Sequence, residues 1–274
     1  MECEKDITVI ISTYNQPEWL EKVLWGYETQ SYKNFELIIA DDGSDVITKD
    51  LISRFQKRNT LCIHHTWHAD NGFQKTAILN KAILRSSTAY LIFSDGDCIP
   101  RKDFVEVHVK GRKPGRYISG GYFLLPLSTS KQITELDIQS QNIFQKEWLY
   151  KNGVKKTSKM LKLTSFGFFE RLLNTITPTK ATWNGHNSSG WKNDILSVNG
   201  FDERMQYGGE DCELGDRLVN IGIMPIQLRY SAICVHLDHS RGYKNQESLT
   251  INKNIRKTTQ TNRAKHTNFG IKKD

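Results

Sequence analysis

The chain has 274 residues, 38% of them hydrophobic, and carries 38 Lys and Arg against 30 Asp and Glu, which gives a net charge of +8 at pH 7. A chain of this length and apolar content can bury a sizeable core, which excludes a disordered protein and indicates a globular one. No run of about 18 apolar residues occurs, and the acidic opening MECEKDITVIIST reaches a predicted strand too early for a signal peptide. We therefore expect neither a membrane-spanning helix nor secretion, and we place the protein in the cytoplasm.

The cysteines are odd in number, widely spaced and without a CxxC pair, which indicates reduced thiols rather than a disulfide framework or a zinc ribbon. Basic residues gather between 151 and 162 and again between 256 and 273, so an anionic partner is expected. Charge alone does not distinguish nucleic acid, an anionic membrane face, a phosphorylated small molecule and a merely solvated surface. The cysteines are Cys3, Cys62, Cys98, Cys212 and Cys234.

The first half of the chain alternates predicted strands and helices. Residues 7–13, ITVIIST, form an apolar β-branched run, and segment 17–30 has apolar residues at helical spacing behind Pro17, which suits a first helical turn. Strands that are apolar on both faces and alternate with helices predict an α/β fold, with a mostly parallel central sheet covered by helices on both faces. The alternation continues with strands at 35–40, about 61–64 and 89–93, and with helices at 46–58 and about 73–84.

Polar residues follow three of these strands at the point where each strand ends. They are TYN at 13–15, DDGSD at 41–45 and DGD at 95–97. Ligands of open α/β sheets bind at the carboxyl ends of the strands, so we expect these segments to meet at one edge of the sheet. No GxGxxG or GxxxxGK[ST] sequence follows any strand, which weakens dinucleotide-binding and P-loop interpretations.

The pattern changes beyond residue 116. Residues 116–127 predict another strand, and the Lys-rich and aromatic-rich segment that follows has helical stretches and is expected to be an insertion that faces a partner. A glycine-rich turn then leads into a predicted helix at about 210–221, and a last strand is predicted at 226–239. The chain thus divides into 1–127, an insertion at 128–182, a completing part at 183–240 and a polar, basic tail at 241–274, which we expect to be loosely held.

Asp95 and Asp97 stand one residue apart at the end of a predicted buried strand. Two carboxylates this close repel each other, so they need a cation, a shared proton or full solvation. The pair fits an oxygen-ligand site for Mg²⁺ or Mn²⁺ that also holds phosphates. An EF-hand loop is excluded because Ile99 and Pro100 stand where it needs an oxygen ligand and a glycine. The alternative without a function is an Asp-Gly turn after a strand.

Two further acidic pairs have both a functional and a structural interpretation. Asp41 and Asp42 end a strand, where a carboxylate can accept hydrogen bonds from a nucleotide base or ribose, although an Asp-Gly turn with an Asx cap on the next helix is the better interpretation of this pair alone. Glu210 and Asp211 open a helix, where negative charge is stabilised by the backbone dipole. The same position beside a flexible glycine turn also suits a general base that removes a proton from a hydroxyl group.

Histidines offer a second set of potential metal ligands. His236, on the last predicted strand, is a third ligand for a metal at Asp95 and Asp97, or else a packed strand residue. His64, His65 and His68 resemble a zinc cluster by spacing alone. Because adjacent residues of a strand face opposite ways, we do not expect this trio to share one ion.

Four blocks of the chain, in order, resemble the nucleotide-sugar-dependent glycosyltransferases of family 2. They are TYNQPEWLEKVLWGYETQSYKNFELIIADDGS, DNGFQKTAILNKAI, YLIFSDGDCIP and WKNDILSVNGFDERMQYGGEDCELGDRL. The resemblance covers most of residues 7–240. The last block is similar to the C-terminal part of bacterial polysaccharide and galactosyl-type transferases of this family.

The resemblance implies a GT-A, Rossmann-like fold with a helical insertion on the acceptor side, a nucleoside-diphosphate sugar donor, a Mn²⁺ or Mg²⁺ cofactor and inversion at the anomeric carbon. It makes Asp211 the catalytic base, with Glu210 orienting hydroxyl groups of the donor or acceptor. It assigns the metal and diphosphate to Asp95 and Asp97, with His236 as a further metal ligand. It places Thr13, Tyr14, Asn15, Asp41 and Asp42 around the nucleoside, and Asn187, Trp191, Gly208 and Gly209 near the acceptor or the transferred sugar.

The family resemblance does not determine which donor and which acceptor the protein prefers, because one residue departs from the family pattern and one segment has no counterpart in it. Gln74 stands where many relatives have an arginine, so a charge contact near the nucleotide is missing at that position. The insertion at 128–182 matches nothing in the family pattern and is where the acceptor is usually chosen. We expect the acceptor to be a glycan or a lipid-linked saccharide, and the basic, aromatic stretch 145–180 suggests peripheral contact with the inner, anionic face of a membrane.

Three other functions compete with glycosyl transfer. A non-catalytic protein that binds a nucleotide sugar or a polyanion is the main alternative, although the presence of Asp211 counts against it. A nucleotidyltransferase would need a phosphate-binding loop rich in glycine and basic residues after the first strand, and TYNQPEW is not such a loop. No helix-turn-helix, zinc or aromatic RNA-binding motif appears, so nucleic acid is not an expected partner.

Overall fold

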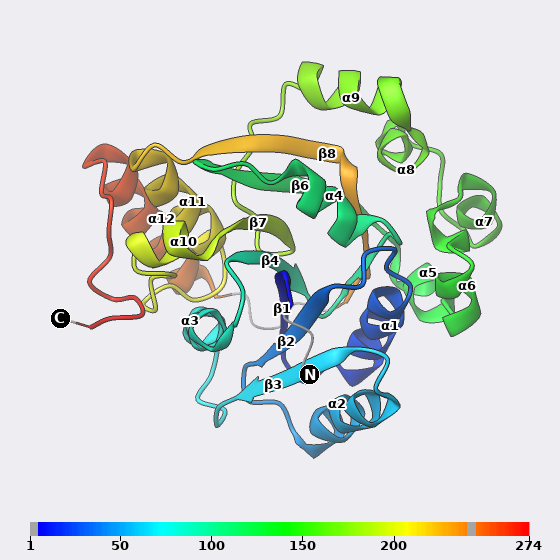
Figure 1. Ribbon diagram of the computed structural model, residues 1–274, viewed down its shortest axis with the longest axis horizontal. Coiled ribbons are helices and arrows are strands. Elements are labelled where there is room, and N and C mark those ends of the chain that lie inside the picture. The colour runs from blue at the N-terminus through cyan, green and yellow to red at the C-terminus, as the bar shows by residue number, and fades with distance from the viewer. Residues whose placement is uncertain (1–4, 240–244, 274) are drawn as a thin grey trace.

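The computed structural model describes residues 5–239 and 245–273, and its strands form one sheet of eight in the order β3-β2-β1-β4-β7-β6-β8-β5 (Figure 1). The strands are β1 (Ile7–Thr13), β2 (Phe35–Asp41), β3 (Cys62–Trp67), β4 (Tyr90–Asp95), β5 (Cys98–Pro100), β6 (Arg116–Leu124), β7 (Asn187–Trp191) and β8 (Met224–His236).

Helices connect and cover these strands. In the first half they are α1 (Pro17–Glu28), α2 (Val46–Arg58), α3 (Lys75–Arg85) and α4 (Phe104–Gly111). The insertion carries α5 (Leu127–Gln132), α6 (Glu135–Gln139), α7 (Lys146–Lys151), α8 (Leu161–Thr164) and α9 (Gly167–Ile176), with 3-10 turns at Asn142–Phe144 and Ser158–Met160. The last part carries α10 (Lys192–Ser197), α11 (Glu210–Asn220) and α12 (Gln246–Thr261).

The parallel half of the sheet brings three polar strand ends together. β1 pairs in parallel with β2 and with β4, so that Thr13 lies opposite Asp41 and Ser12 lies opposite Asp95. All seven residues of β1 and of β2 are buried, as expected for strands covered on both faces. The polar segments that follow these strands therefore share one edge of the sheet.

The second half of the sheet mixes parallel and antiparallel pairs. β7 joins β4 to β6 in antiparallel fashion, and β8 runs parallel to β6. The short strand β5 pairs with β8 so that Cys98 lies opposite His236. This pairing places the end of β8 directly beside the Asp95–Asp97 turn.

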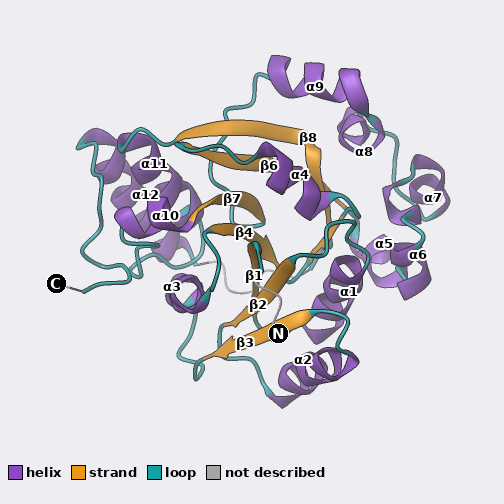
Figure 2. Cartoon of the chain, viewed as in Figure 1, coloured by secondary structure: helices purple, strands orange, loops and turns teal. Residues whose placement is uncertain are grey.

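Two apolar cores lie on the two faces of the sheet, as the α/β prediction requires. One contains residues of α1 and α2, such as Leu24 and Phe55, packed on Val9 and Leu37. The other contains residues of α3 and α11 together with the fully buried Trp183. Figure 2 shows α1 and α2 on one side of the strands and α3, α10 and α11 on the other.

The tail prediction was wrong for the described part of 241–274. Residues 246–261 form α12, which packs against α11 through an ion pair between Arg256 Nε and Asp216 Oδ2 at 2.7 Å. The inward positions of α12 are Ser248, Asn252 and Thr259, all polar and all buried. Because hydrogen bonds rather than apolar side chains hold α12 against the rest of the protein, its sequence has no hydrophobic periodicity from which a helix could be predicted.

The insertion is helical, as expected, and its short helices lie along one side of the molecule beside α1 and β8 (Figure 1). Among the described residues, none of the helices is both long and apolar enough to cross a membrane.

Candidate active site

A pocket of about 720 Å³ opens at the edge where β1 and β4 end. Its walls come from the three polar strand ends, from the start of α3, from the glycine turn before α11 and from the end of β8. Most predicted site residues line it: Thr13, Tyr14, Asn15, Asp42, Asp95, Asp97, Gly208, Gly209, Glu210, Asp211 and His236.

Asp95 ends β4 deep in this pocket. Its Oδ1 accepts hydrogen bonds from the Ser12 hydroxyl at 2.5 Å and from Lys75 Nζ at 2.7 Å. Burial by itself raises the pKa of Asp95, but the charge and hydrogen bond of Lys75 outweigh burial and hold that pKa at about 2. Asp95 is therefore a carboxylate at any physiological pH.

Asp97 directly precedes β5, and the pairing of β5 with β8 brings it beside the end of β8. Its Oδ2 is 2.8 Å from His239 Nε2 and 3.8 Å from His236 Nε2. Burial opposes ionisation, but the hydrogen bond from His239 and the charge of His236 lower the pKa of Asp97. The arrangement sets a second carboxylate and two imidazoles next to Asp95.

These donors fit a divalent cation. The nearest ligand atoms of Asp97, Cys98 and His236 all lie within 4.8 Å of one another. Carboxylate oxygens and imidazole nitrogens are a suitable set for Mn²⁺, and carboxylates alone suit Mg²⁺. The two neighbouring carboxylates, buried together, also gain from a cation that offsets their repulsion.

The second acidic group of the pocket stands at the start of α11. Asp211 Oδ2 accepts the backbone N–H of Gly185 at 2.8 Å, and its Oδ1 accepts the N–H of Cys212 at 2.6 Å. Glu210 Oε2 accepts the N–H of Gly208 at 2.8 Å. Burial and the neighbouring charge of Asp211 raise the pKa of Glu210 to about 7.

The glycine turn is required by backbone geometry. Gly208 and Gly209 have φ of 107° and 89°, a region that residues with a side chain rarely adopt. A Cβ at Gly208 would also lie 2.5 Å from the side chain of Leu249 on α12. The turn thus fixes the direction in which Glu210 and Asp211 leave the backbone.

The pocket also contains groups suited to a nucleoside. Asp42 Oδ1 is 2.8 Å from His68 Nε2, and its Oδ2 accepts the N–H of Gln74 at 3.0 Å. Phe73 and Tyr207 also line the pocket there, with their rings packed edge to face 6.1 Å apart. Polar acceptors beside aromatic faces are a common setting for a flat heterocycle.

Three predicted site residues, Asp41, Asn187 and Trp191, lie outside the pocket lining. Asp41 is buried and accepts from the Ser44 N–H and from His65 Nε2, each at 2.8 Å, so it shapes the turn. Asn187 is buried and donates to the Gly121 and Ala232 carbonyl oxygens at 2.7 and 2.9 Å. Trp191 pairs with Tyr90, at the other end of β4 from Asp95.

Sequence reasoning did not assign three groups that the structure places in the pocket: Lys75, His186 and His239. Burial lowers the pKa of Lys75, but Asp95, Glu210 and Asp211 together raise it above its ordinary value, so it is a cation among three carboxyl groups. Burial lowers the pKa of His186 to about 4, so that ring is neutral. A signal for Lys75 was its position next to Gln74, where the family resemblance implies an arginine.

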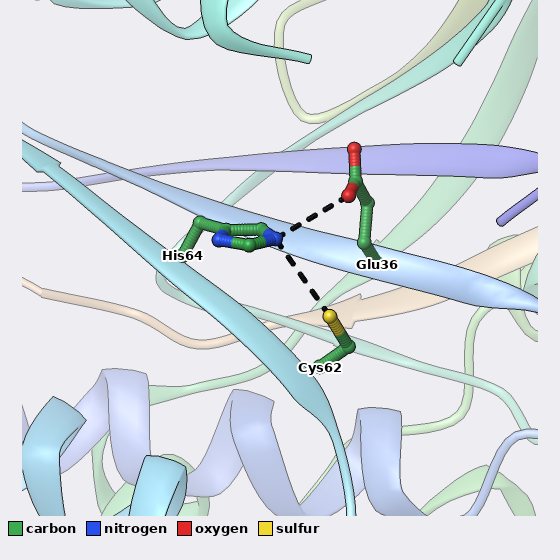
Figure 3. A group of neighbouring side chains, drawn as sticks. All are labelled: Glu36, Cys62 and His64. Carbon is green, nitrogen blue, oxygen red and sulfur yellow. Dashed lines mark hydrogen bonds and ion pairs between the residues drawn. The ribbon is translucent and has the colours of Figure 1, made fainter. Parts of the chain in front are cut away.

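His64, His65 and His68 each contact a different acidic residue. His65 contacts Asp41 and His68 contacts Asp42, as given above. His64, on β3, lies 3.4 Å from Glu36 Oε2 and 3.7 Å from Cys62 Sγ (Figure 3). This last group lies outside the pocket lining, and the other oxygen of Glu36 already accepts bonds from Thr8 and Ser87.

Comparisons with known proteins find similarity to glycosyltransferases. Residues 8–123 match the model of glycosyl transferase family 2. Over 258 residues the chain is 26% identical to validoxylamine A glucosyltransferase of Streptomyces hygroscopicus subsp. jinggangensis. The matched region covers 90% of this chain and 59% of that protein. The chain therefore spans less than two thirds of the length of this curated relative.

Solved structures share the fold at lower identity. The mannosyltransferase PcManGT from Pyrobaculum calidifontis, in complex with GDP-Man and Mn²⁺, has a TM-score of 0.59 and 17% identity over 88% of this chain and 59% of its own. Residues 1–349 of S. aureus TarS, in complex with UDP-GlcNAc, have a TM-score of 0.58 and 16% identity over 87% of this chain and 60% of theirs. The mixed sheet and its helices are thus the GT-A fold.

Proposed function

We propose that the chain is a family 2 glycosyltransferase that moves a hexose from a nucleoside-diphosphate sugar, in its UDP form, to a hydroxyl group of a glycan or lipid-linked saccharide, with inversion. The observation that carries this proposal is that one pocket brings the carboxylates of Asp95 and Asp97 together with the carboxylate of Asp211.

The donor would lie along the strand ends. Thr13, Tyr14, Asn15 and Asp42 would contact the nucleoside, beside the rings of Phe73 and Tyr207. Mn²⁺ or Mg²⁺ would be held by Asp95, Asp97 and His236, with His239 alongside. When bound, the cation would neutralise the negative charge that develops on the leaving nucleoside diphosphate. Lys75, a cation in the same pocket, adds to that stabilisation.

The acceptor would be activated at the glycine turn. Asp211 takes the proton of the attacking hydroxyl group, whose oxygen bonds to the anomeric carbon, while the bond from that carbon to the diphosphate breaks and its electron pair leaves with the nucleoside diphosphate. A single displacement of this kind inverts the anomeric centre. Glu210, whose pKa lies at about 7, can donate or accept a hydrogen bond and would orient a sugar hydroxyl. The Gly208–Gly209 turn would border the transferred sugar.

We assign the enzyme to bacterial surface polysaccharide biosynthesis, such as capsule or lipopolysaccharide, at the cytoplasmic face of the membrane. Nucleotide sugars are made in the cytoplasm, and the free cysteines among the described residues suit a reducing compartment. The net charge of +8 favours contact with an anionic surface.

Asp211→Asn tests the proposed base. The amide keeps the size of the side chain but cannot take a proton, so transfer should fall about 100-fold or more while the Kd for UDP stays within about twofold. Turnover is measured by release of UDP from a panel of UDP-sugars, and UDP binding by calorimetry. Undiminished transfer by the variant would remove Asp211 from the mechanism.

A further inference from the structure

Helix α9 is attached to the protein by its polar side. The Asn174 side chain donates to the Ser231 hydroxyl at 2.7 Å and accepts the backbone N–H of Tyr230 at 2.8 Å, both on β8. The Ser231 hydroxyl donates to Glu170, one turn earlier on the helix. Figure 1 shows α9 at the periphery, beside β8 and far from α3 and α12.

The apolar side of α9 faces outward. Phe168 is 83% exposed, Ile176 is 61% exposed and Phe169 is 49% exposed, and none of the ten residues of the helix is buried. A surface helix of a globular protein normally turns its apolar stripe toward the core. The reversed orientation of α9 leaves a contiguous apolar surface that calls for a partner.

The surroundings of α9 are strongly basic. Between residues 152 and 182 the sequence has six Lys and Arg and one acidic residue, Glu170, whose carboxylate is turned inward to Ser231. The exposed cations are Lys155, Lys156, Lys159, Arg171 and Lys180. An apolar stripe flanked by cations fits an anionic membrane surface. A second copy of the chain fits less well, since a symmetric contact would bring two basic faces together.

A second pocket, of about 240 Å³, lies between this segment and the active site. Lys162, Lys180 and Arg229 line it, and no Asp or Glu is among the described residues of its lining. Burial and the charge of Arg229 lower the pKa of Lys162 to about 8, and its Nζ donates to the Tyr122 carbonyl oxygen at 2.9 Å. Cations held together without a counter-charge repel each other, and a bound anion relieves this repulsion.

The two pockets share a wall. His186 lines both of them, and the residue before it, Gly185, donates its N–H to Asp211. A ligand whose anionic group lies in the second pocket can therefore extend toward the carboxylate of Asp211.

We propose that the acceptor is an amphiphile with a phosphate or diphosphate group, which binds at Lys162, Lys180 and Arg229 while its apolar chain lies with α9 at the membrane surface. This inference rests on the proposed function, because it concerns the acceptor of that reaction. The donor site and the anion subsite remain separable, since they occupy different pockets.

Vesicle sedimentation tests the role of α9. The wild-type chain should bind vesicles of equal parts phosphatidylcholine and phosphatidylglycerol, bind pure phosphatidylcholine less, and be released by salt. Phe168→Ser with Phe169→Ser should weaken binding roughly tenfold or more. Leu84→Ser with Ile251→Ser, which changes exposed apolar residues on α3 and α12, is the matched control and should bind normally. Equal binding by the Phe168/Phe169 variant would overturn the membrane contact.

Self-association is read by ultracentrifugation of the same proteins. A wild-type dimer that the Phe168/Phe169 substitutions convert to a monomer, together with no vesicle binding, would assign α9 to a contact between copies and overturn the proposal.

Binding of farnesyl phosphate, below its micelle concentration, tests the anion subsite. It should bind more tightly than either farnesol or inorganic phosphate, and Lys180→Gln with Arg229→Gln should weaken it about tenfold or more. Lys49→Gln with Lys57→Gln, on α2, is the charge-matched control. Unchanged binding by the Lys180/Arg229 variant, or equal binding of inorganic phosphate, would overturn the lipid phosphate subsite.

The UDP-dependent rise in melting temperature, measured on every variant, separates the two proposals. A normal UDP response without farnesyl phosphate binding overturns the amphiphile alone. Absence of the UDP response in the wild-type chain overturns the proposed function.

Discussion

Lys75 interacts electrostatically with three carboxyl groups of the pocket. It pairs with Asp95 at 2.7 Å and is drawn toward Glu210 and Asp211 as well. The family resemblance implies an arginine near the nucleotide at the preceding position, which here is Gln74. We interpret Lys75 as the group that supplies this charge from the first turn of α3.

Lys75→Gln should weaken UDP binding in the presence of Mn²⁺ by about 10- to 100-fold, because a charge-assisted hydrogen bond contributes about 1.5–3 kcal/mol. Calorimetric titration gives the Kd, and Lys75→Arg, which keeps the charge, should lose much less. Equal affinity of the Gln variant and the wild type would mean that Lys75 only balances the charge of Asp95.

Glu210 makes the stability of the unliganded protein depend on pH. Its pKa is raised from 4.5 to about 7 by burial and by Asp211, so the folded state binds this proton more tightly than the unfolded state. The resulting stabilisation is complete below pH about 4.5 and is lost as pH rises through 7. Glu210→Gln removes this dependence.

Urea unfolding at pH 5 and pH 8 measures the effect. Between these values the wild type should lose about 2 kcal/mol more stability than Glu210→Gln does. Parallel pH profiles for the two proteins would place the pKa of Glu210 near its ordinary value.

At the scale of elements, α12 supports the glycine turn before α11. The Asn252 side chain donates to the carbonyl oxygens of Gln206 and Gly208 at 2.9 and 3.0 Å. These contacts hold the backbone that leads into Glu210 and Asp211. A helix near the end of the chain thus takes part in positioning the proposed base.

Asn252→Ala should lower kcat about tenfold and weaken UDP binding less, because the turn that carries Glu210 and Asp211 moves, whereas Thr13, Asn15 and Asp42 do not. Stability should fall by roughly 1–3 kcal/mol, since the two carbonyl groups lose their donor. Asn254→Ala, at an exposed position of the same helix, is the control. A fall in UDP affinity equal to the fall in kcat would show that α12 supports the whole domain rather than the turn.

The sequence predicted the elements whose signal is local. β1 and α2 have the predicted bounds, and the polar ends of β1 and β4 meet as expected. β7 and α12 were not predicted because their buried residues are polar. The Ser189 hydroxyl of β7 forms hydrogen bonds with Tyr90 and His108. Asn252 of α12 forms hydrogen bonds with the glycine turn before α11. Such residues are satisfied by partners far away in the chain, which no periodicity reveals.

The candidate site was predictable in part for the same reason. Asp95, Asp97 and Asp211 follow recognisable strand and turn signals. His239 reaches Asp97 only through the pairing of β5 with β8, a long-range contact. Asn187 and Trp191 have residue types suited to sugar contact, but the antiparallel direction of β7 buries one and carries the other to the far end of β4.

For the whole molecule, we assign the pocket at the strand ends to the nucleotide-sugar donor and the basic, apolar surface around α9 to contact with a membrane. The cationic pocket lies between them. On this proposal the nucleotide sugar would arrive from solution, and the acceptor would arrive from the membrane side.

The measurement that tests the central claim most directly is the thermal unfolding midpoint with UDP, GDP or CMP, each with and without Mn²⁺. A ligand at about 100 times its Kd stabilises the folded state by about 2.7 kcal/mol, which is several degrees for a domain of this size. We predict such a shift with UDP, dependent on Mn²⁺ and absent in Asp97→Ala. If none of the nucleotides moves the midpoint, the pocket is not a nucleotide-sugar site, and a binding role for the basic surface becomes the better account.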